Sequence, residues 1–259
     1  MASGWENDPR LARTPVIDVP ITATNMDVVL AFIEEHIQNV KGEYICVSNA
    51  HTTVMAHDDP DYYRVQTESL MSVPDGKPLS VVGGKAVPTM GRVTGPDLMR
   101  EIFEVSAEHG YRHYFYGNTK ENVEALVAAL ERDYPGLDIC GYEPSVFRDM
   151  TSQEESDLAM RINETKPDFV WVALGAPRQE CFCHRMRGRI DGLMVGVGGA
   201  FNILAGITPE APIWMQNMSL EWLYRLIQEP RRLFKRYFVT NSKFMYYQIA
   251  GRKRNKGSK

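Results

Sequence analysis

Short, almost wholly apolar runs recur along the first 200 residues, and each is followed by small or polar residues. Four of them have the length and the β-branched or aromatic content of strands: Tyr44–Ser48, His113–Gly117, Phe169–Gly175 and Leu193–Gly199. A run that is apolar at nearly every position, rather than at every second one, predicts a strand buried on both faces. The pattern therefore predicts a largely parallel sheet with helices on both sides.

Between these runs, apolar residues recur with the period of a helix. Four such stretches begin near a capping residue or end at a helix-terminating one: Asp27–Val40, Asp97–His109, Thr119–Tyr134 and Thr151–Lys166. Residues 111–141 and 151–175 are typical of successive helix and strand units in one sheet. The fold class that follows is α/β, with a mostly parallel sheet and helices on both faces.

The charge of the chain is unevenly divided. The 259 residues carry a net charge of −4, but residues 225–259 hold eleven basic residues and one acid, so the tail is near +10 and residues 1–224 are near −14. Aromatic residues alternate with basic ones from Ser219 onward. This pattern is typical of a segment that contacts an anionic bilayer or clamps a diphosphate, while a nucleic-acid contact or a docked helix pair stays open. We divide the chain into a domain, 1–218, and a helical basic appendage, 219–259.

Composition narrows the class of protein. With 44% apolar and 24% charged residues, the chain has the make-up of a globular protein, which excludes disordered and collagen-like classes. Four cysteines do not form a disulfide framework. The N-terminus lacks the basic and apolar regions of a signal peptide, and the longest apolar runs are strand-sized. We therefore expect a cytoplasmic protein.

Small residues end three of the predicted strands. Gly117 ends the second, Gly175, Ala176 and Pro177 end the third, and Gly198 and Gly199 end the fourth. In a parallel sheet such turns gather at one edge, where backbone N–H groups at helix starts bind phosphate; the alternative is that glycine ends a strand for backbone reasons alone. Pro177 suits the first position of the next helix. Neither a Gly-x-Gly-x-x-Gly nor a P-loop segment is present, which argues against a dinucleotide dehydrogenase and a P-loop NTPase.

Polar side chains in three further segments are candidates for the chemistry. Asp75 lies in a Pro-Asp-Gly turn and is a candidate general base, because burial would raise its pKa toward neutrality. The alternative is a β-turn with no catalytic role. Asn49 is suited to bind a sugar hydroxyl and His51 to acid–base work, but a helix cap and a structural histidine are the alternatives. Gln179 and Glu180 fall in the first turn of the next helix, where we expect them to point at the ligand edge; a capped surface helix is the alternative.

Two segments have the composition of a metal site. Asp58–Asp61 contains the Asp-x-Asp pattern of metal-dependent glycosyltransferases, although acids around a proline are also an ordinary helix start. Cys181–His184 is dense in ligand types, yet residues two apart face different sides of a helix. We therefore expect neither a metal nor a cofactor.

Taken in order, these segments resemble the bacterial WecG/TagA/CpsF glycosyltransferase family (family 26). The matching segments are Ser48–His51, Pro74–Gly76, Arg92–Leu98, Phe115–Gly117, Tyr134–Gly136, Ala173–Glu180, Val195–Phe201, Ala205–Gly206 with Ala211–Pro212, and Leu220–Leu226 with Glu229–Arg232. They extend over about residues 16 to 240, nearly the whole chain. The resemblance implies a Rossmann-like domain and a C-terminal appendage that reaches the membrane and helps to complete the site.

The family's activity is implied with it: an inverting transfer of a hexosyl or N-acetylhexosaminyl group from a UDP-sugar to a polyprenyl-diphosphate-linked saccharide. Such enzymes act at the inner face of the plasma membrane in exopolysaccharide, capsule or teichoic-acid synthesis, and are thought not to need a metal. The implied partners are the donor, the lipid-linked acceptor and an anionic membrane surface, not nucleic acid; homo-oligomerisation stays open. The alternatives are a nucleotide-sugar oxidoreductase or epimerase, and a membrane- or nucleic-acid-binding module that acts through the tail.

The family's functional residues can be carried over one at a time. Its proposed general base falls on Asp75, and its site asparagine, arginine and glutamine fall on Asn49, Arg92 and Gln179. The appendage arginines, expected to bind the acceptor diphosphate and the membrane, are Arg225, Arg231 or Arg232, and Arg236. We expect the substrate site to be lined by His51, Gly117, Gly175, Ala176, Pro177, Glu180, Gly198 and Gly199.

The chain departs from the family pattern in the first site loop. Val47 stands where other members have a threonine, so the role of that hydroxyl is lost or passes to Ser48. His51 and Thr52 stand where many members have an acid and an apolar residue. These departures leave the identity of the donor sugar open.

Overall fold

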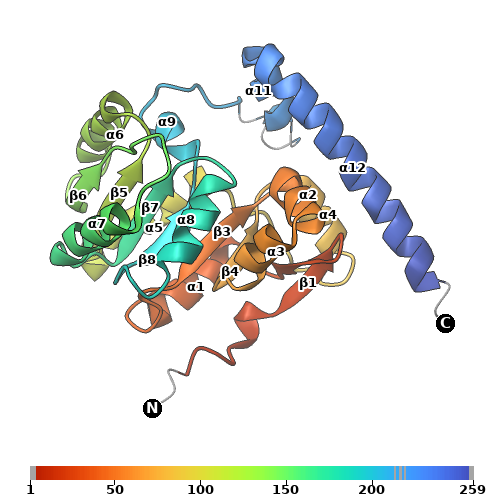
Figure 1. The fold of residues 1–259 in the computed structure, drawn as a ribbon, viewed down its shortest axis with the longest axis horizontal. Coiled ribbons are helices and arrows are strands. Elements are labelled where there is room, and N and C mark those ends of the chain that lie inside the picture. The colour runs from red at the N-terminus through yellow and green to blue at the C-terminus, as the bar shows by residue number, and fades with distance from the viewer. Residues whose placement is uncertain (1–3, 213, 216–217, 219, 257–259) are drawn as a thin grey trace.

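Six strands form one parallel sheet in the computed structural model, which describes residues 4–212, 214–215, 218 and 220–256, apart from the side chains of Arg232, Leu233, Arg236 and residues 252–256. Their order across the sheet is β4-β3-β8-β7-β5-β6 (Figure 1). The strands are β3 (Tyr44–Ser48), β4 (Met71–Pro74), β5 (Arg112–Gly117), β6 (Asp138–Glu143), β7 (Phe169–Ala173) and β8 (Leu193–Gly196). The predicted α/β fold with a mostly parallel sheet is confirmed.

The four predicted strands are β3, β5, β7 and β8. As their continuous apolar character predicts, β3, β7 and β8 are buried at every position. The last two end earlier than predicted, at Ala173 and Gly196, because the small residues that follow form turns. Two strands of the sheet were not predicted: the short strand β4 and the partly exposed edge strand β6. The separate antiparallel hairpin of β1 (Arg13–Val16) and β2 (Val19–Thr22) was not predicted either.

The four predicted helices are present and begin at side-chain caps. They are α1 (Met26–His36), α5 (Gly95–His109), α6 (Lys120–Asp133) and α7 (Ser152–Glu164), capped by Asn25, Thr94, Thr119 and Thr151. The remaining helices of the domain are η1 (Pro9–Leu11), α2 (Ala50–Asp58), α3 (Pro60–Thr67), α4 (Lys77–Gly83), α8 (Arg178–Met186) and α9 (Ala200–Leu204).

Two helix starts resolve alternatives left by the sequence. Asp59 caps α3 and Pro60 is its first residue, so the acidic segment there is a helix start, as one alternative had it. Pro177 is the residue before α8 rather than its first residue, because the helix begins at Arg178, one position later than expected.

The core consists of two apolar layers, one on each face of the sheet. One layer joins α1, α5 and α6 to the sheet through Phe32, Ile102 and Leu126, all of which are buried. The other joins α3, α7 and α8 through side chains such as Ile162 and Phe182. Each buried side chain of this size stabilises the fold by about 1.5–3 kcal/mol. The layers hold the strands firmly, so that the loops at the carboxyl edge have a rigid base.

The C-terminal appendage contains α11 (Glu221–Gln228) and α12 (Pro230–Lys256), and α12 lies along the domain beside α2 (Figure 1). The contact uses one face of α12. His51 lies 3.2 Å from the hydroxyl of Thr240, Phe244 is buried, and Tyr247 donates to Asp58 over 2.7 Å. Among the described residues, no helix is both long and apolar enough to cross a membrane. The division at residues 218 and 219 stays a prediction.

Candidate functional site

The three glycine turns that were predicted to bind a ligand follow β5, β7 and β8, and Asn49 and Asp75 follow β3 and β4. Because these strands are parallel, all five loops lie at the same edge of the sheet. Two of the glycines are required by the backbone. Gly117 has a φ of 124°, and a Cβ there would lie 2.5 Å from the carbonyl oxygen of Ala173. Gly198 has a φ of 53°, and a Cβ there would lie 3.0 Å from Oε1 of Gln179. Backbone conformation and close packing therefore require glycine at both positions, whether or not these turns bind a ligand.

Asp75 lies immediately after β4, in a loop fixed by its neighbours. Its backbone N–H donates to the carbonyl of Ser48 over 2.7 Å, and the carbonyl of Pro74 accepts from Val93 over 2.9 Å. Gly76 then takes a φ of 92° and the chain enters α4. The loop therefore holds the Asp75 carboxyl, which is half-buried, at the edge between β3 and the start of α5.

Four charged side chains act on this carboxyl. Burial raises the pKa of Asp75 from 3.8 to about 6, and the nearby guanidinium groups of Arg225 and Arg92 oppose the rise. The carboxylates of Glu221 and Asp97 add to it. A carboxyl with a pKa near neutrality is ionised at pH 7 and is still a useful proton acceptor. Arg225 and Glu221 belong to α11, so the appendage contributes to the surroundings of Asp75.

Arg92 connects the domain to the appendage. Its Nη1 atom lies 2.7 Å from Oε1 and 2.8 Å from Oε2 of Glu221, and Asp97 is 3.9 Å away. Glu221 was not among the predicted site residues. The signal that points to it is its place as the acid in the first turn of α11, inside a segment that matches the family pattern.

Gln179 and Glu180 are adjacent and both are buried, and Gln179 lies against the turns at Gly175 and Gly198. Gln179 accepts from the N–H of Gly175 over 3.1 Å and donates to Glu180 over 2.9 Å. The expectation that Glu180 points at the ligand edge is wrong for this structure, because its side chain is 1% exposed. One residue along a helix is a rotation of about 100°, which turns Glu180 toward the core. Burial raises the pKa of Glu180 to about 7, although interactions with its own backbone, Gln179 and Tyr62 lower it.

Asn49 and His51 begin α2. The Oδ1 atom of Asn49 accepts from the N–H groups of His51 over 3.0 Å and Thr52 over 3.2 Å, so the helix-cap alternative is confirmed. The cap leaves the Nδ2 amide of Asn49 available as a donor. His51 faces Thr240 of α12 and therefore belongs to the joint between domain and appendage.

The hydroxyl of Ser48 does not replace the family threonine at the surface. Ser48 is 0% exposed, and its hydroxyl donates to Gln66 over 2.6 Å and lies 2.7 Å from the hydroxyl of Ser72. The side chain at 47, a valine, is also buried. Neither position 47 nor position 48 therefore presents a hydroxyl group at the surface of this loop.

The described part of the appendage presents large apolar side chains to solvent. They include Trp222, Ile227, Phe234, Phe238, Met245, Tyr246 and Ile249, which are 46–68% exposed. Phe234 and Phe238 stack with their ring centres 6.3 Å apart. Arg225 and Arg231 are exposed, while the predictions for Arg232 and Arg236 concern side chains outside the described residues. Exposed rings beside cations are typical of a surface that binds an interface.

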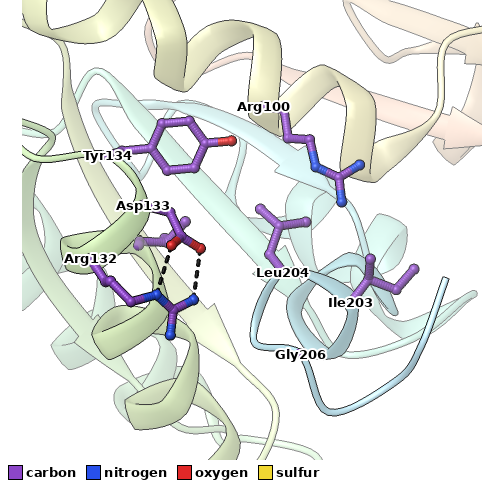
Figure 2. Close-up of a pocket in the computed structure, with 8 residues that line it drawn as sticks. Arg100, Arg132, Asp133, Tyr134, Ile203, Leu204 and Gly206 are labelled. Carbon is purple, nitrogen blue, oxygen red and sulfur yellow. Dashed lines mark hydrogen bonds and ion pairs between the residues drawn. The ribbon is translucent and has the colours of Figure 1, made fainter.

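A cavity of about 280 Å³ lies elsewhere, between α5, α6 and the end of α9 (Figure 2). Both of its guanidinium groups are paired: Arg132 lies 2.7 Å from Asp133, and Arg100 lies 2.7 Å from Glu210. The pair between Arg100 and Glu210 fixes the chain that leads from α9 to the appendage. None of the predicted site residues lines this cavity, so it is not the candidate site.

Polar groups at the carboxyl edge of a parallel α/β sheet are the arrangement in which proteins of this class generally bind ligands. Comparison with known proteins identifies the class further. A sequence model described as the glycosyl transferase WecG/TagA/CpsF family matches residues 14–258. The chain therefore belongs to this family and is a glycosyltransferase. The predicted family resemblance is confirmed, and the oxidoreductase, epimerase and non-enzymatic alternatives are not supported.

Three of the similar proteins carry the name N-acetylglucosaminyldiphosphoundecaprenol N-acetyl-beta-D-mannosaminyltransferase. The protein of that name from Bacillus subtilis (strain 168) is 31% identical over 220 residues, which are 83% of each chain. That from Bacillus spizizenii is 32% identical over 196 residues, 74% of each chain. That from Staphylococcus aureus (strain MW2) is 25% identical over 219 residues, 84% of this chain and 83% of its own.

Proposed function

We propose that this glycosyltransferase moves an N-acetylhexosaminyl or related hexosyl group from a UDP-sugar to a polyprenyl-diphosphate-linked saccharide, with inversion, in the synthesis of a cell-envelope polymer. The names of the similar proteins support the acceptor, since each describes transfer to a sugar on diphosphoundecaprenol. The observation that carries the mechanism is a half-buried Asp75 with a pKa of about 6, facing Arg92 and Arg225.

Asp75 is the general base in this proposal. The acceptor hydroxyl attacks the anomeric carbon of the donor and loses its proton to the Asp75 carboxylate, while the bond to UDP breaks and its electron pair leaves with the diphosphate. A base with a pKa near the working pH is both ionised and basic enough to take the proton. The Nδ2 amide of Asn49, which the helix cap leaves available, is positioned nearby to bind a sugar hydroxyl.

The leaving diphosphate gains negative charge as the reaction proceeds. Arg92 and Arg225 supply two cations next to Asp75, and the N–H groups of the turns at Gly175 and Gly198 supply neutral donors. Arg92 is paired with Glu221 in the structure, and in this proposal the donor diphosphate replaces that carboxylate as its anionic partner. We propose that these groups neutralise the leaving diphosphate without a metal ion.

The appendage delivers the acceptor in this proposal. Its exposed rings insert at the interfacial region of an anionic membrane, and its arginines face the lipid headgroups and the acceptor diphosphate. Restricting the search for a lipid-linked substrate to the membrane surface raises its effective concentration at Asp75. The proposed location is therefore the inner face of the plasma membrane, with peripheral attachment.

The test is turnover with a panel of UDP-sugars and a polyprenyl-diphosphate-N-acetylglucosamine acceptor, with and without a chelator. We expect transfer from at least one UDP-N-acetylhexosamine, unchanged by the chelator, and loss of transfer in Asp75→Asn with UDP affinity retained. Asp18→Asn is the control, because Asp18 occupies an exposed turn elsewhere, between β1 and β2, and its variant should keep full activity. Full activity of Asp75→Asn would reject the proposed base.

A further inference from the structure

A row of buried polar side chains runs beneath the carboxyl edge of the sheet and joins the loop that holds Asp75 to the turn at Gly175. We call it the buried polar chain. Its members are Ser48, Ser72, Gln66, Tyr62, Glu180 and Gln179, and none is more than 5% exposed. Buried polar groups destabilise a fold unless they are hydrogen-bonded to one another, so such a chain has a defined arrangement.

One arm of the chain comes from β3 and β4. The hydroxyls of Ser48 and Ser72 donate to Oε1 of Gln66 over 2.6 and 2.9 Å. The Nε2 atom of Gln66 then donates to the hydroxyl of Tyr62 over 3.0 Å. The Tyr62 hydroxyl faces Glu180 and lowers the pKa of its carboxyl. The hydrogen bonds of this arm thus lead from β3 and β4 to the Tyr62 hydroxyl, which faces Glu180.

The other arm comes from the end of β7. The N–H of Gly175 donates to Oε1 of Gln179, and Nε2 of Gln179 donates to Oε1 of Glu180. Glu180 is therefore the acceptor at which both arms end. Its Oε2 atom is buried and accepts no hydrogen bond of ordinary geometry from the part of the chain that the structure describes. The Oε1 atom of Glu180 accepts from the Gln179 amide, so Glu180 sets the direction of this arm at Gln179.

The direction matters most at Gln179. The oxygen and nitrogen ends of an amide have nearly the same shape, so only hydrogen-bond partners decide which way the amide faces. In the reverse orientation its NH₂ group would face the N–H of Gly175, and both donors would lack an acceptor. The same amide supports the next turn, because a Cβ on Gly198 would lie 3.0 Å from Oε1 of Gln179 and one on Gly196 would lie 3.3 Å from its Nε2.

We propose that Glu180 is a positioning residue that fixes the amide of Gln179 and, through it, the turns at Gly175 and Gly198 that receive the donor diphosphate. The identity of the donor rests on the proposed function. The arrangement of the two turns does not, because contacts within the chain itself define it.

The test compares Glu180→Gln, which keeps an acceptor oxygen, with Glu180→Leu, which has none at a similar volume. The ligand-free readout is the hydrogen exchange of the Gly175 amide. We expect its protection to fall about tenfold in Glu180→Leu and to stay near the wild-type value in Glu180→Gln. If Glu180→Leu does not fold, Glu180→Met serves in its place. Unchanged protection in the folded apolar variant would overturn the proposal.

The functional readout is a double-mutant cycle with Gln179→Ala, measured by donor KM, kcat and calorimetric UDP binding. If Glu180 acts through Gln179, the double variant Gln179→Ala/Glu180→Leu binds UDP as weakly as Gln179→Ala alone, and additive losses would overturn the proposal. Glu180→Leu alone should raise donor KM about tenfold, with a smaller change in kcat.

The matched control is Cys183→Ala, which removes another fully buried side chain from the same helix. It should lower Tm without raising donor KM; an equal rise in KM would mean general loosening of α8 and would overturn the proposal. The two proposals fail differently. Wild-type protein that binds no UDP contradicts the proposed function, whereas the Gly175 exchange result decides the role of Glu180 in either case.

Discussion

Replacing Asp75 by asparagine should stabilise the protein while it abolishes transfer. The raised pKa of Asp75, about 6 against an ordinary 3.8, means that ionising this carboxyl is harder in the folded protein than in the unfolded chain. The difference is roughly two pKa units, and at 1.36 kcal/mol per unit it amounts to about 3 kcal/mol. Asparagine has a similar shape and never ionises, so the variant avoids this cost.

The difference in the free energy of unfolding between Asp75→Asn and wild type depends on pH. Below about pH 4 the carboxyl is protonated in both states, and the two proteins should unfold with the same free energy. Between about pH 4 and 6 only the unfolded chain releases the proton, so wild-type stability falls relative to the variant. Above pH 6 the full difference is reached and stays constant. For a chain of this size about 3 kcal/mol corresponds to a Tm higher by roughly 6 to 12 °C.

The assay is denaturant unfolding of wild type and Asp75→Asn at pH 4 and pH 8, together with turnover at pH 8. The expected pattern is equal stability at the lower pH, a more stable variant at the higher pH, and no transfer by the variant. The reasoning would be refuted by equal stability at pH 8, since the carboxyl would then not be desolvated. It would also be refuted by a variant that is less stable at pH 8 than at pH 4 relative to wild type.

Two further predictions concern α12. Phe244→Ala should remove the apolar contact that holds α12 on the domain, so we expect faster proteolysis within α12 and lower transfer. Phe234→Ala is the control, because this ring is exposed and its loss should leave the rate of proteolysis unchanged. Equal proteolysis of the two variants would contradict the docking role of Phe244. The double variant Phe234→Ser/Phe238→Ser should have a Tm within about 1 °C of the wild-type value, because both rings are exposed. It should cosediment several-fold more weakly with anionic lipid vesicles. Unchanged cosedimentation would exclude these rings from the membrane contact.

The sheet and its main helices follow from local patterns in the sequence. Continuous apolar runs predicted β3, β7 and β8 because burial on both faces leaves no polar position, and side-chain caps such as Thr119 predicted the helix starts. The strands that were missed lack this signal. β6 lies at the edge and is partly exposed, and β4 is only four residues long. Their strand structure depends on neighbours that are distant in the sequence.

The candidate site was predictable in its residue types but not in its long-range pairs. The Pro-Asp-Gly turn and its resemblance to the family pointed to Asp75, and the structure brings Arg92 and Arg225 beside it. The contact of Arg92 with Glu221 joins segments far apart in the chain, which no local pattern reports. The burial of Glu180 was not predicted either, because a residue that follows a candidate site residue on a helix can face the core.

The central claim is that Asp75 and the appendage form one site, and the most direct test is the pH dependence of kcat/KM in wild type and in Arg225→Ala. Because Arg225 opposes the rise in the pKa of Asp75, its removal should move the acid limb of the profile from about pH 6 to a higher pH, and Arg231→Ala should leave the limb in place. An acid limb that stays at the same pH in Arg225→Ala would contradict the account.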